Sequence, residues 1–206
     1  DARKTRFDTQ AVHAGESKHK PYGALTMPIV QTSTYCFEDT AALVEHMRRK
    51  ESRLEPVRGE YGRYGNPTQE AVEHKLAALD GGEAAIVLSS GMAAITATLL
   101  TFLSAGDHYI LTEDCYRKTR QLSLEFMPRV GIACSVVSLG DYDALEAAIT
   151  PQTRLILAES PTNPYLRVAD LSRIAAIARQ HDILTLIDAT FATPYNLRPL
   201  EYGIDL

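Results

Sequence analysis

RLILAE (residues 154–159) and ILTLID (residues 183–188) are two short apolar runs that each end on an acidic residue. Between them, LSRIAAIARQ (residues 171–180) is typical of an amphipathic helix, and Asp170 is well placed as its N-cap. This order predicts two parallel strands joined by a crossover helix. Similar runs at AAIVL (84–88), HYILT (108–112) and ACSVV (133–137) extend the rhythm. We therefore predict a doubly wound α/β domain.

Four further helices belong to this pattern. We expect them over Met92 to Phe102, Arg117 to Met127, Tyr142 to Ile149, and before the first strand. Asp141 is the expected N-cap of the third. The fourth begins with Asn66 as N-cap and Pro67 at its first position, and it stops at Gly81-Gly82.

The first 66 residues follow no such rhythm. Pro21, Pro28 and Pro56 interrupt them, and only Thr40 to Glu51 is typical of a helix. We predict that residues 1–66 form an extended arm and that residues 67–206 form the α/β domain. At the other end, Ile204 to Leu206 resembles the start of another strand, so we expect a longer polypeptide.

The composition of the chain excludes several classes of function. The 206 residues are 45% hydrophobic, which is ample for a core, and the net charge of −5 disfavours a nucleic-acid partner. Three cysteines at irregular spacing favour a reducing compartment, by default the cytoplasm. No apolar stretch approaches the roughly 18 to 20 residues of a membrane span. The six histidines are scattered, so we expect no metal site.

Ligands of open α/β sheets bind beyond the carboxyl ends of the strands. At those ends we single out the turn Ser89-Ser90-Gly91-Met92 for a phosphate and Asp188 for a buried cationic ring nitrogen. Asn163 is held in a loop with two prolines, and Tyr116 precedes several cations and could stack on a planar ligand.

Each feature also has a plain structural interpretation. The serine turn is equally typical of an ordinary capped βα turn, and Asp188 of an N-cap or a loop ion pair. Asn-Pro is a common structural turn, and charges at a helix start are usually solvated. Cys115 is expected to be structural.

Five motifs in order carry a resemblance: YGRYGNPT (61–68), SSGM (89–92), DCYRKTR (114–120), ESPTNP (159–164) and DATFATP (188–194). Together they resemble the Cys/Met-metabolism family of pyridoxal-phosphate enzymes, which contains cystathionine γ-synthase, cystathionine γ- and β-lyases and methionine γ-lyase. The resemblance implies an aspartate aminotransferase-like, fold type I large domain. It has a mostly parallel sheet with helices on both faces and an N-terminal arm before it.

The resemblance also implies site residues. Ser90, Gly91 and Met92 would form the phosphate cup, with Thr190 as a further cofactor contact. Asp188 would pair with the pyridine nitrogen and Tyr116 would stack on the ring, both as catalytic residues. Asn163 would bind the substrate carboxylate.

Tyr61 and Arg63 would reach the phosphate of a neighbouring subunit, in a homo-oligomer built as a dimer of dimers with shared active sites. Glycines around them would let the arm approach the other chain closely. The Schiff-base lysine of the family lies in a Ser-x-x-Lys segment, which we expect beyond Leu206. We expect the C-terminal domain of the family beyond Leu206 as well.

The reaction that we expect is γ-replacement on an activated homoserine ester by cysteine, which gives cystathionine. Eliminating members usually carry two glycines or Gly-Cys after the stacking tyrosine, whereas Arg117-Lys118-Thr119-Arg120 follows Tyr116 in this chain. The alternatives are elimination, as in the γ- and β-lyases, and, from another class, a non-catalytic nucleotide-binding or interaction module.

Overall fold

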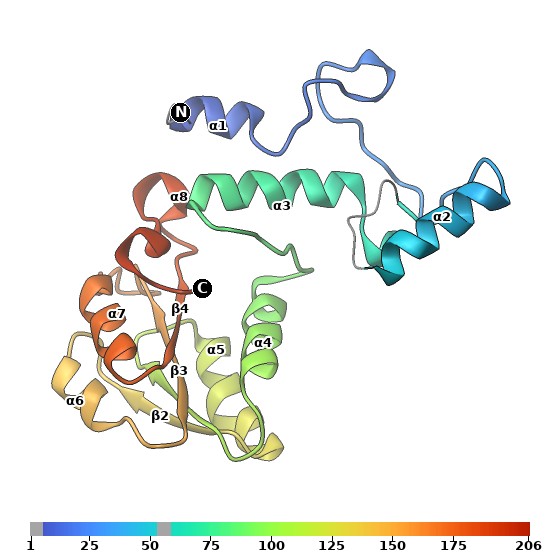
Figure 1. The fold of residues 1–206 in the computed structure, drawn as a ribbon. Helices are drawn as coiled ribbons and strands as arrows, with labels where there is room; N and C mark the ends of the chain where they lie inside the picture. The colour runs from blue at the N-terminus through green and yellow to red at the C-terminus, as the bar shows by residue number, and fades with distance from the viewer. Residues whose placement is uncertain (1–5, 53–58) are drawn as a thin grey trace. The chain divides into compact units, whose positions relative to one another are not determined.

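A four-stranded parallel sheet is the centre of residues 88–206 in the computed structural model, which describes residues 6–52 and 59–206. The strands run in the spatial order β2-β1-β3-β4 (Figure 1). They are β1 (His108–Thr112), β2 (Ala133–Val137), β3 (Thr153–Glu159) and β4 (Leu184–Asp188). All three pairings are parallel, as predicted, and four of the five expected strands are present within one residue of the expected bounds.

Helices cover both faces of this sheet (Figure 1). Side chains alternate along β3, so that Leu155 and Leu157 pack with Leu99 while Ile156 and Ala158 pack on the opposite face. The first face is covered by α4 (Gly91–Phe102) and the segment that starts with α5 (Arg117–Gln121), the second by α6 (Tyr142–Ala147) and α7 (Leu171–Gln180). This two-sided burial explains why the strands are almost continuously apolar.

Side-chain caps fix the helix starts that the sequence predicts. The carboxylate of Asp170 accepts the N–H of Arg173 at 3.1 Å, and that of Asp141 accepts the N–H of Ala144 at 3.0 Å. The chain then leaves β4 through α8 (Thr193–Asn196) and a 3-10 helix (Pro199–Tyr202).

The prediction of a strand at residues 84–88 is wrong. These residues have no strand partner within the described part of the chain. Strand backbone groups need a neighbouring strand, and those of Val87 bond to side chains of a helix instead. Its N–H donates to Glu73 at 2.9 Å, and its carbonyl accepts from Gln69 at 3.5 Å.

The helix expected from Arg117 to Met127 is only partly regular. After α5 the chain forms a π-helical turn (Leu122–Phe126) and a 3-10 helix (Met127–Val130). Pro128 has no N–H to give, and its ring would clash with the carbonyl four residues earlier, so the regular ladder cannot continue.

Residues 204–206 are not a strand either, although Leu206 lies beside β4. Its N–H donates to the carbonyl of Thr185, and its carbonyl accepts the N–H of Ile187, both at 3.0 Å. This is the bonding of one residue in a parallel pair, so the expected pairing is present at a single position.

Contacts divide the chain into two compact units. The first unit contains residues up to Leu79 and Glu83–Val87; the second contains Asp80–Gly82 and Leu88–Leu206. Among its described residues lie the helices α1 (Phe7–His13), α2 (Thr40–Glu51) and α3 (Pro67–Asp80, whose last residue belongs to the second unit), with 3-10 helices at Pro21–Gly23 and Gly62–Tyr64. The predicted cap of α3 is present, because Asn66 accepts the N–H of Thr68 at 2.8 Å.

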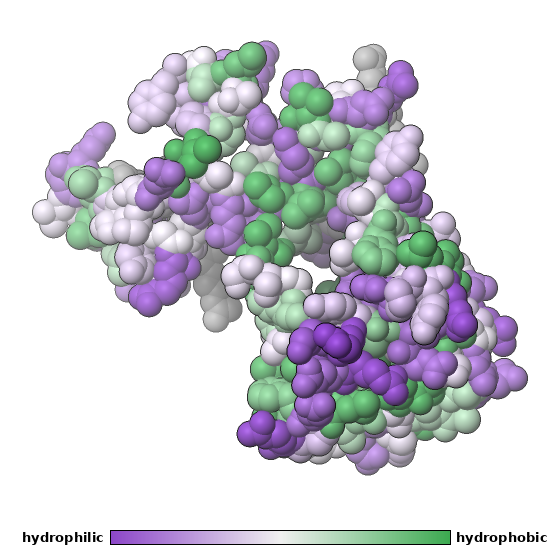
Figure 2. Space-filling view, turned by 180° about the vertical axis from the view of Figure 1, so that it is seen from behind, coloured by the Kyte–Doolittle hydropathy of each residue, from purple (hydrophilic) through white to green (hydrophobic). Residues whose placement is uncertain are grey.

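The first unit buries few of its side chains. Among its described residues only His46 and Ala77 are buried, whereas many large apolar side chains are exposed, including Val12, Tyr22 and Leu25. Apolar surface is visible among the polar side chains in Figure 2. A unit with so little buried apolar area gains little stability from its own packing.

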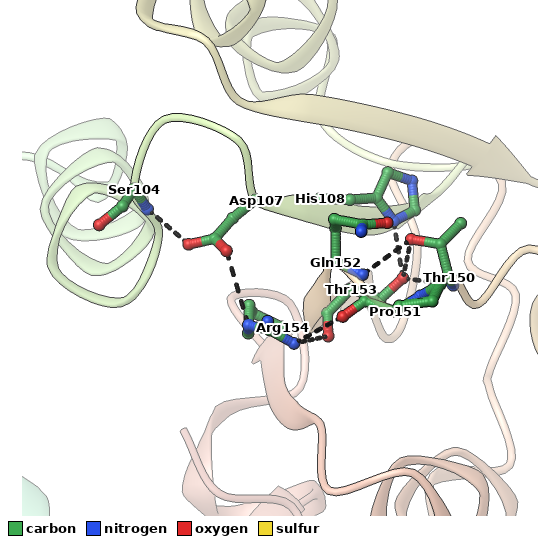
Figure 3. A network of polar contacts seen from close by, with 8 residues as sticks. All are labelled: Ser104, Asp107, His108, Thr150, Pro151, Gln152, Thr153 and Arg154. Carbon is green, nitrogen blue, oxygen red and sulfur yellow. Dashed lines mark hydrogen bonds and ion pairs between the residues drawn. The ribbon is translucent and has the colours of Figure 1, made fainter.

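A polar network closes the amino ends of β1 and β3 (Figure 3). The ring nitrogens of His108, which is buried, lie 2.8 Å from the hydroxyl of Thr153 and 2.9 Å from that of Ser135. Asp107 pairs with Arg154 at 3.5 Å beside it. This edge is therefore occupied by its own side chains, which leaves the carboxyl edge for a ligand.

None of the helices in the described ranges combines the length and apolar composition that a membrane span requires.

Candidate active site

Two carboxylates close neighbouring strands at the carboxyl edge of the sheet. Glu159 ends β3, Asp188 ends β4, and the two residues are partners in the parallel register. Oδ1 of Asp188 accepts both the N–H and the hydroxyl of Thr190, the N–H at 3.1 Å. Its Oδ2 accepts no hydrogen bond from the residues that the structure describes. Asp188 is half-buried, so one oriented oxygen remains for a cationic N–H donor.

Glu159 brings two loops to this edge. Its Oε2 accepts the N–H of Tyr116 at 2.5 Å, and its Oε1 accepts the N–H of Asn163 at 2.8 Å. Tyr116 is 43% exposed, which leaves it accessible for stacking. Tyr116, Asn163 and Asp188 therefore lie around a single buried carboxylate.

The serine turn begins α4 at the same sheet. Ser90 is its N-cap and accepts the N–H of Ala93 at 3.1 Å. No hydrogen bond from the described residues uses the N–H of Gly91 or Met92, and a Cβ on Gly91 would meet no atom within 4 Å. Two free N–H groups at an open helix N-terminus suit an anion.

The same turn is tied to the Tyr116 loop. The hydroxyl of Thr119, in α5, donates to Sδ of Met92 at 3.7 Å. Through this contact and through Glu159, the second unit collects the predicted residues Ser90, Gly91, Met92, Tyr116, Asn163, Asp188 and Thr190 at one edge of its sheet.

Together these groups fit a ligand of one chemical kind. It has an anionic tail for the helix N-terminus, a flat ring for Tyr116 and a protonated ring nitrogen for Asp188. Pyridoxal phosphate has all three, so the residues present fit this cofactor. No group of three or more His, Cys, Asp or Glu among the described residues is arranged to hold a metal ion.

Tyr61 and Arg63 belong to the first unit. The guanidinium of Arg63 lies 5.1 Å from the ring centre of Tyr61 and is exposed. The glycines around them have a local reason. A Cβ on Gly59 would come within 2.8 Å of the Tyr35 ring, and one on Gly62 within 3.3 Å of Ser33. The close approach that these glycines permit is therefore to this chain's own residues.

The family follows from comparison with known proteins. The family of Cys/Met metabolism PLP-dependent enzymes matches residues 8–206. The chain belongs to this family. Pyridoxal phosphate is the cofactor of the family, and its enzymes act in sulfur amino-acid metabolism. The predicted family and cofactor are thereby confirmed, and membership favours an enzyme over a non-catalytic module.

Relatives within the Cys/Met metabolism family catalyse different reactions. The chain is 44% identical over 198 residues to "Cystathionine gamma-synthase 1, chloroplastic" of Arabidopsis thaliana, with 95% of the chain and 34% of that protein covered. It is 42% identical over 203 residues to "Cystathionine beta-lyase" of Lactococcus lactis subsp. cremoris (strain MG1363), with 98% and 50% covered. The chain thus spans a third to a half of these relatives.

The fold is also found among solved structures of the family. The metY protein of Campylobacter jejuni subsp. jejuni, solved with N'-pyridoxyl-lysine-5'-monophosphate, superposes with a TM-score of 0.88 at 31% identity. The alignment covers 98% of this chain and 48% of that one. This confirms the predicted parallel α/β fold of the pyridoxal-phosphate enzymes.

Sequence reasoning missed the central residue of this edge. Glu159 ends an apolar strand in the same way as Asp188, and that position is the signal in the sequence that could have found it. Burial raises its pKa, and the neighbouring Asp188 carboxylate raises it further, against the two N–H donors that lower it. Burial likewise raises the pKa of the Cys115 thiol to about 11, which suits the predicted structural role.

Proposed function

We propose that the protein catalyses γ-replacement on an activated homoserine ester, with cysteine as the incoming thiol and cystathionine as the product. The observation that carries this proposal is the cationic segment directly after Tyr116. A groove of about 470 Å³ there is lined by Arg117, Lys118 and Arg120, with Gln121, Leu124 and Glu125. Exposed cations beside the stacking tyrosine suit an ester that bears a negative charge, such as a succinyl or phosphoryl group.

The chain's own residues hold the cofactor and the substrate in this proposal. Gly91 and Met92 donate their N–H groups to the phosphate, with Ser90 and Thr190 as neighbours. Asp188 accepts from the pyridine nitrogen, Tyr116 covers the ring and Asn163 donates to the substrate carboxylate. When bound, pyridoxal phosphate supplies an electron-withdrawing ring that acidifies the protons on Cα and Cβ of the substrate. Tyr116 is the residue of this set that can exchange a proton with the substrate.

A second copy of the chain completes each site in this proposal. Tyr61 and Arg63 would contact the phosphate in a neighbouring subunit, within a dimer of dimers. The exposed Arg63 supports this, because its guanidinium contacts the rings of Tyr61 and Tyr64 and forms no ion pair with the described residues. So does the small number of buried side chains in the first unit, whose exposed apolar surface a neighbouring arm could cover.

Elimination is the second candidate. The identities of 44% to a synthase and 42% to a β-lyase differ too little to favour either reaction. The cationic segment after Tyr116 favours replacement, because it suits a substrate with a negatively charged ester group. We also propose a cytoplasmic location, because Cys115 and Cys134 form no disulfide.

Product analysis of the full-length protein tests the proposal. It is incubated with O-succinylhomoserine or O-phosphohomoserine, with and without cysteine. We expect cystathionine plus succinate or phosphate when cysteine is present. A keto acid and ammonia formed at the same rate with and without cysteine, and no cystathionine, would show an eliminating lyase instead.

A further inference from the structure

One buried side chain supports both loops of the candidate site. Glu159 is 6% exposed, and each of its two carboxylate oxygens accepts one backbone N–H. One N–H belongs to Tyr116, which follows β1, and the other to Asn163, which follows β3. A carboxylate that accepts one donor on each oxygen fixes the separation of the two loops.

A second link between these loops is weaker. Arg167 pairs with Asp114 at 2.9 Å, but the arginine side chain is 60% exposed. Exposed ion pairs contribute only about 0–1 kcal/mol, because water and salt screen them. The Glu159 carboxylate is therefore the buried connection between the loops.

The charge on Glu159 is unfavourable where it lies. Burial raises the pKa of Glu159 even though two N–H groups bond to its carboxylate, and Asp188 adds a like charge in the neighbouring strand. An apolar side chain at the end of β3 would avoid this cost, since buried charges are poor stabilisers in general. Glu159 is thus better explained by what it holds in place than by stability.

We propose that Glu159 is a positioning residue, which holds the stacking ring of Tyr116 and the amide of Asn163 at a fixed separation beside Asp188. This inference rests on the proposed function, because the value of the fixed separation is the alignment of cofactor and substrate. Loops that follow different strands would otherwise move independently, and small displacements of positioned groups are costly to catalysis. The residue touches neither ligand and acts through its two neighbours.

The first test measures the bridge without the cofactor. Hydrogen exchange is followed in the cofactor-free, full-length protein and its Glu159→Gln variant. Glutamine fills the same space but has one acceptor for two donors, so the amides of Tyr116 and Asn163 compete. We expect at least one of the two to exchange at least about tenfold faster, as for the loss of a hydrogen bond to a charged group. Glu113→Gln is the matched control, an exposed residue of the same loop that should change nothing.

The second test measures alignment in the loaded protein. The visible circular dichroism of bound pyridoxal phosphate reports how the ring is oriented in its site. We expect Glu159→Gln to lose or alter this band while Glu113→Gln retains it. A purely structural residue would change stability without changing the band in the folded protein.

The outcomes separate the two proposals. A wild-type protein that shows no cofactor band at saturating pyridoxal phosphate would overturn the proposed function and this role with it. A normal wild-type band that Glu159→Gln leaves unchanged would overturn the positioning role alone, as would unchanged exchange at both amides. If Glu159→Gln does not fold, Glu159→Asp retains the charge on a shorter side chain, and unchanged exchange and dichroism in that variant would equally overturn it.

Discussion

Asp188→Asn is the substitution that separates charge from shape at the candidate site. Oδ1 of Asp188 is held by Thr190, and an asparagine oxygen can accept the same two hydrogen bonds. The second oxygen, which accepts nothing from the described residues, becomes an NH₂ donor. A protonated ring nitrogen would then face a donor where it needs an acceptor.

The size of the effect follows from this geometry. A hydrogen bond to a charged group contributes about 1.5–3 kcal/mol, and about 1.4 kcal/mol corresponds to a tenfold change in affinity. We therefore expect the dissociation constant of pyridoxal phosphate to rise about 10- to 150-fold. The Thr190 contacts remain, so the free energy of unfolding without cofactor should change little.

Equilibrium titration of the full-length protein with pyridoxal phosphate measures this constant. Asp170→Asn is the matched control, because asparagine is as good an N-cap as aspartate and α7 should keep its start. Equal cofactor affinity in wild type and Asp188→Asn would refute the assignment of Asp188 to the ring nitrogen.

Three further predictions concern other parts of the chain. Burial lowers the pKa of His108, so the folded state binds fewer protons than the unfolded state, and stability should fall as the pH drops below 6.5. The free energy of unfolding, measured in urea at several pH values, should depend less on pH in His108→Gln than in wild type. The same pH dependence in both proteins would contradict this. Ser90→Ala should lower the free energy of unfolding of the cofactor-free protein by about 1 kcal/mol through loss of the α4 cap, and an unchanged midpoint in denaturant would argue against the cap. Arg63→Ala should weaken pyridoxal phosphate binding about tenfold in the assembled oligomer, and full affinity there would exclude its phosphate role.

Local signals predicted the second unit well. α7 has the predicted bounds because an aspartate cap, an apolar stripe and a following strand all agree at its ends. The helix after Tyr116 was predicted as one piece from Arg117 to Met127, but regular helix ends at Gln121, because Pro128 cannot supply an N–H to the ladder and its ring crowds the turn before it. The run at 84–88 failed for another reason, since apolar composition cannot supply a partner strand.

The residues of the candidate site were likewise predicted only in part. Asp188 was found because it ends a strand at the edge where ligands bind, and Tyr116 because it follows one. The serine turn was found because it follows an apolar run and begins a helix, although that run is not a strand. Glu159 also ends a strand at this edge, but the sequence alone assigns it no ligand. Its role depends on two backbone N–H groups, one of them 43 residues away, and no local pattern in the sequence shows that contact.

A crystal structure of the full-length protein grown with pyridoxal phosphate tests the central claim most directly. The account predicts the phosphate on the N–H groups of Gly91 and Met92, the ring under Tyr116 and the ring nitrogen within hydrogen-bonding distance of Asp188. Cofactor bound elsewhere, or an Asp188 carboxylate turned away from it, would contradict the account.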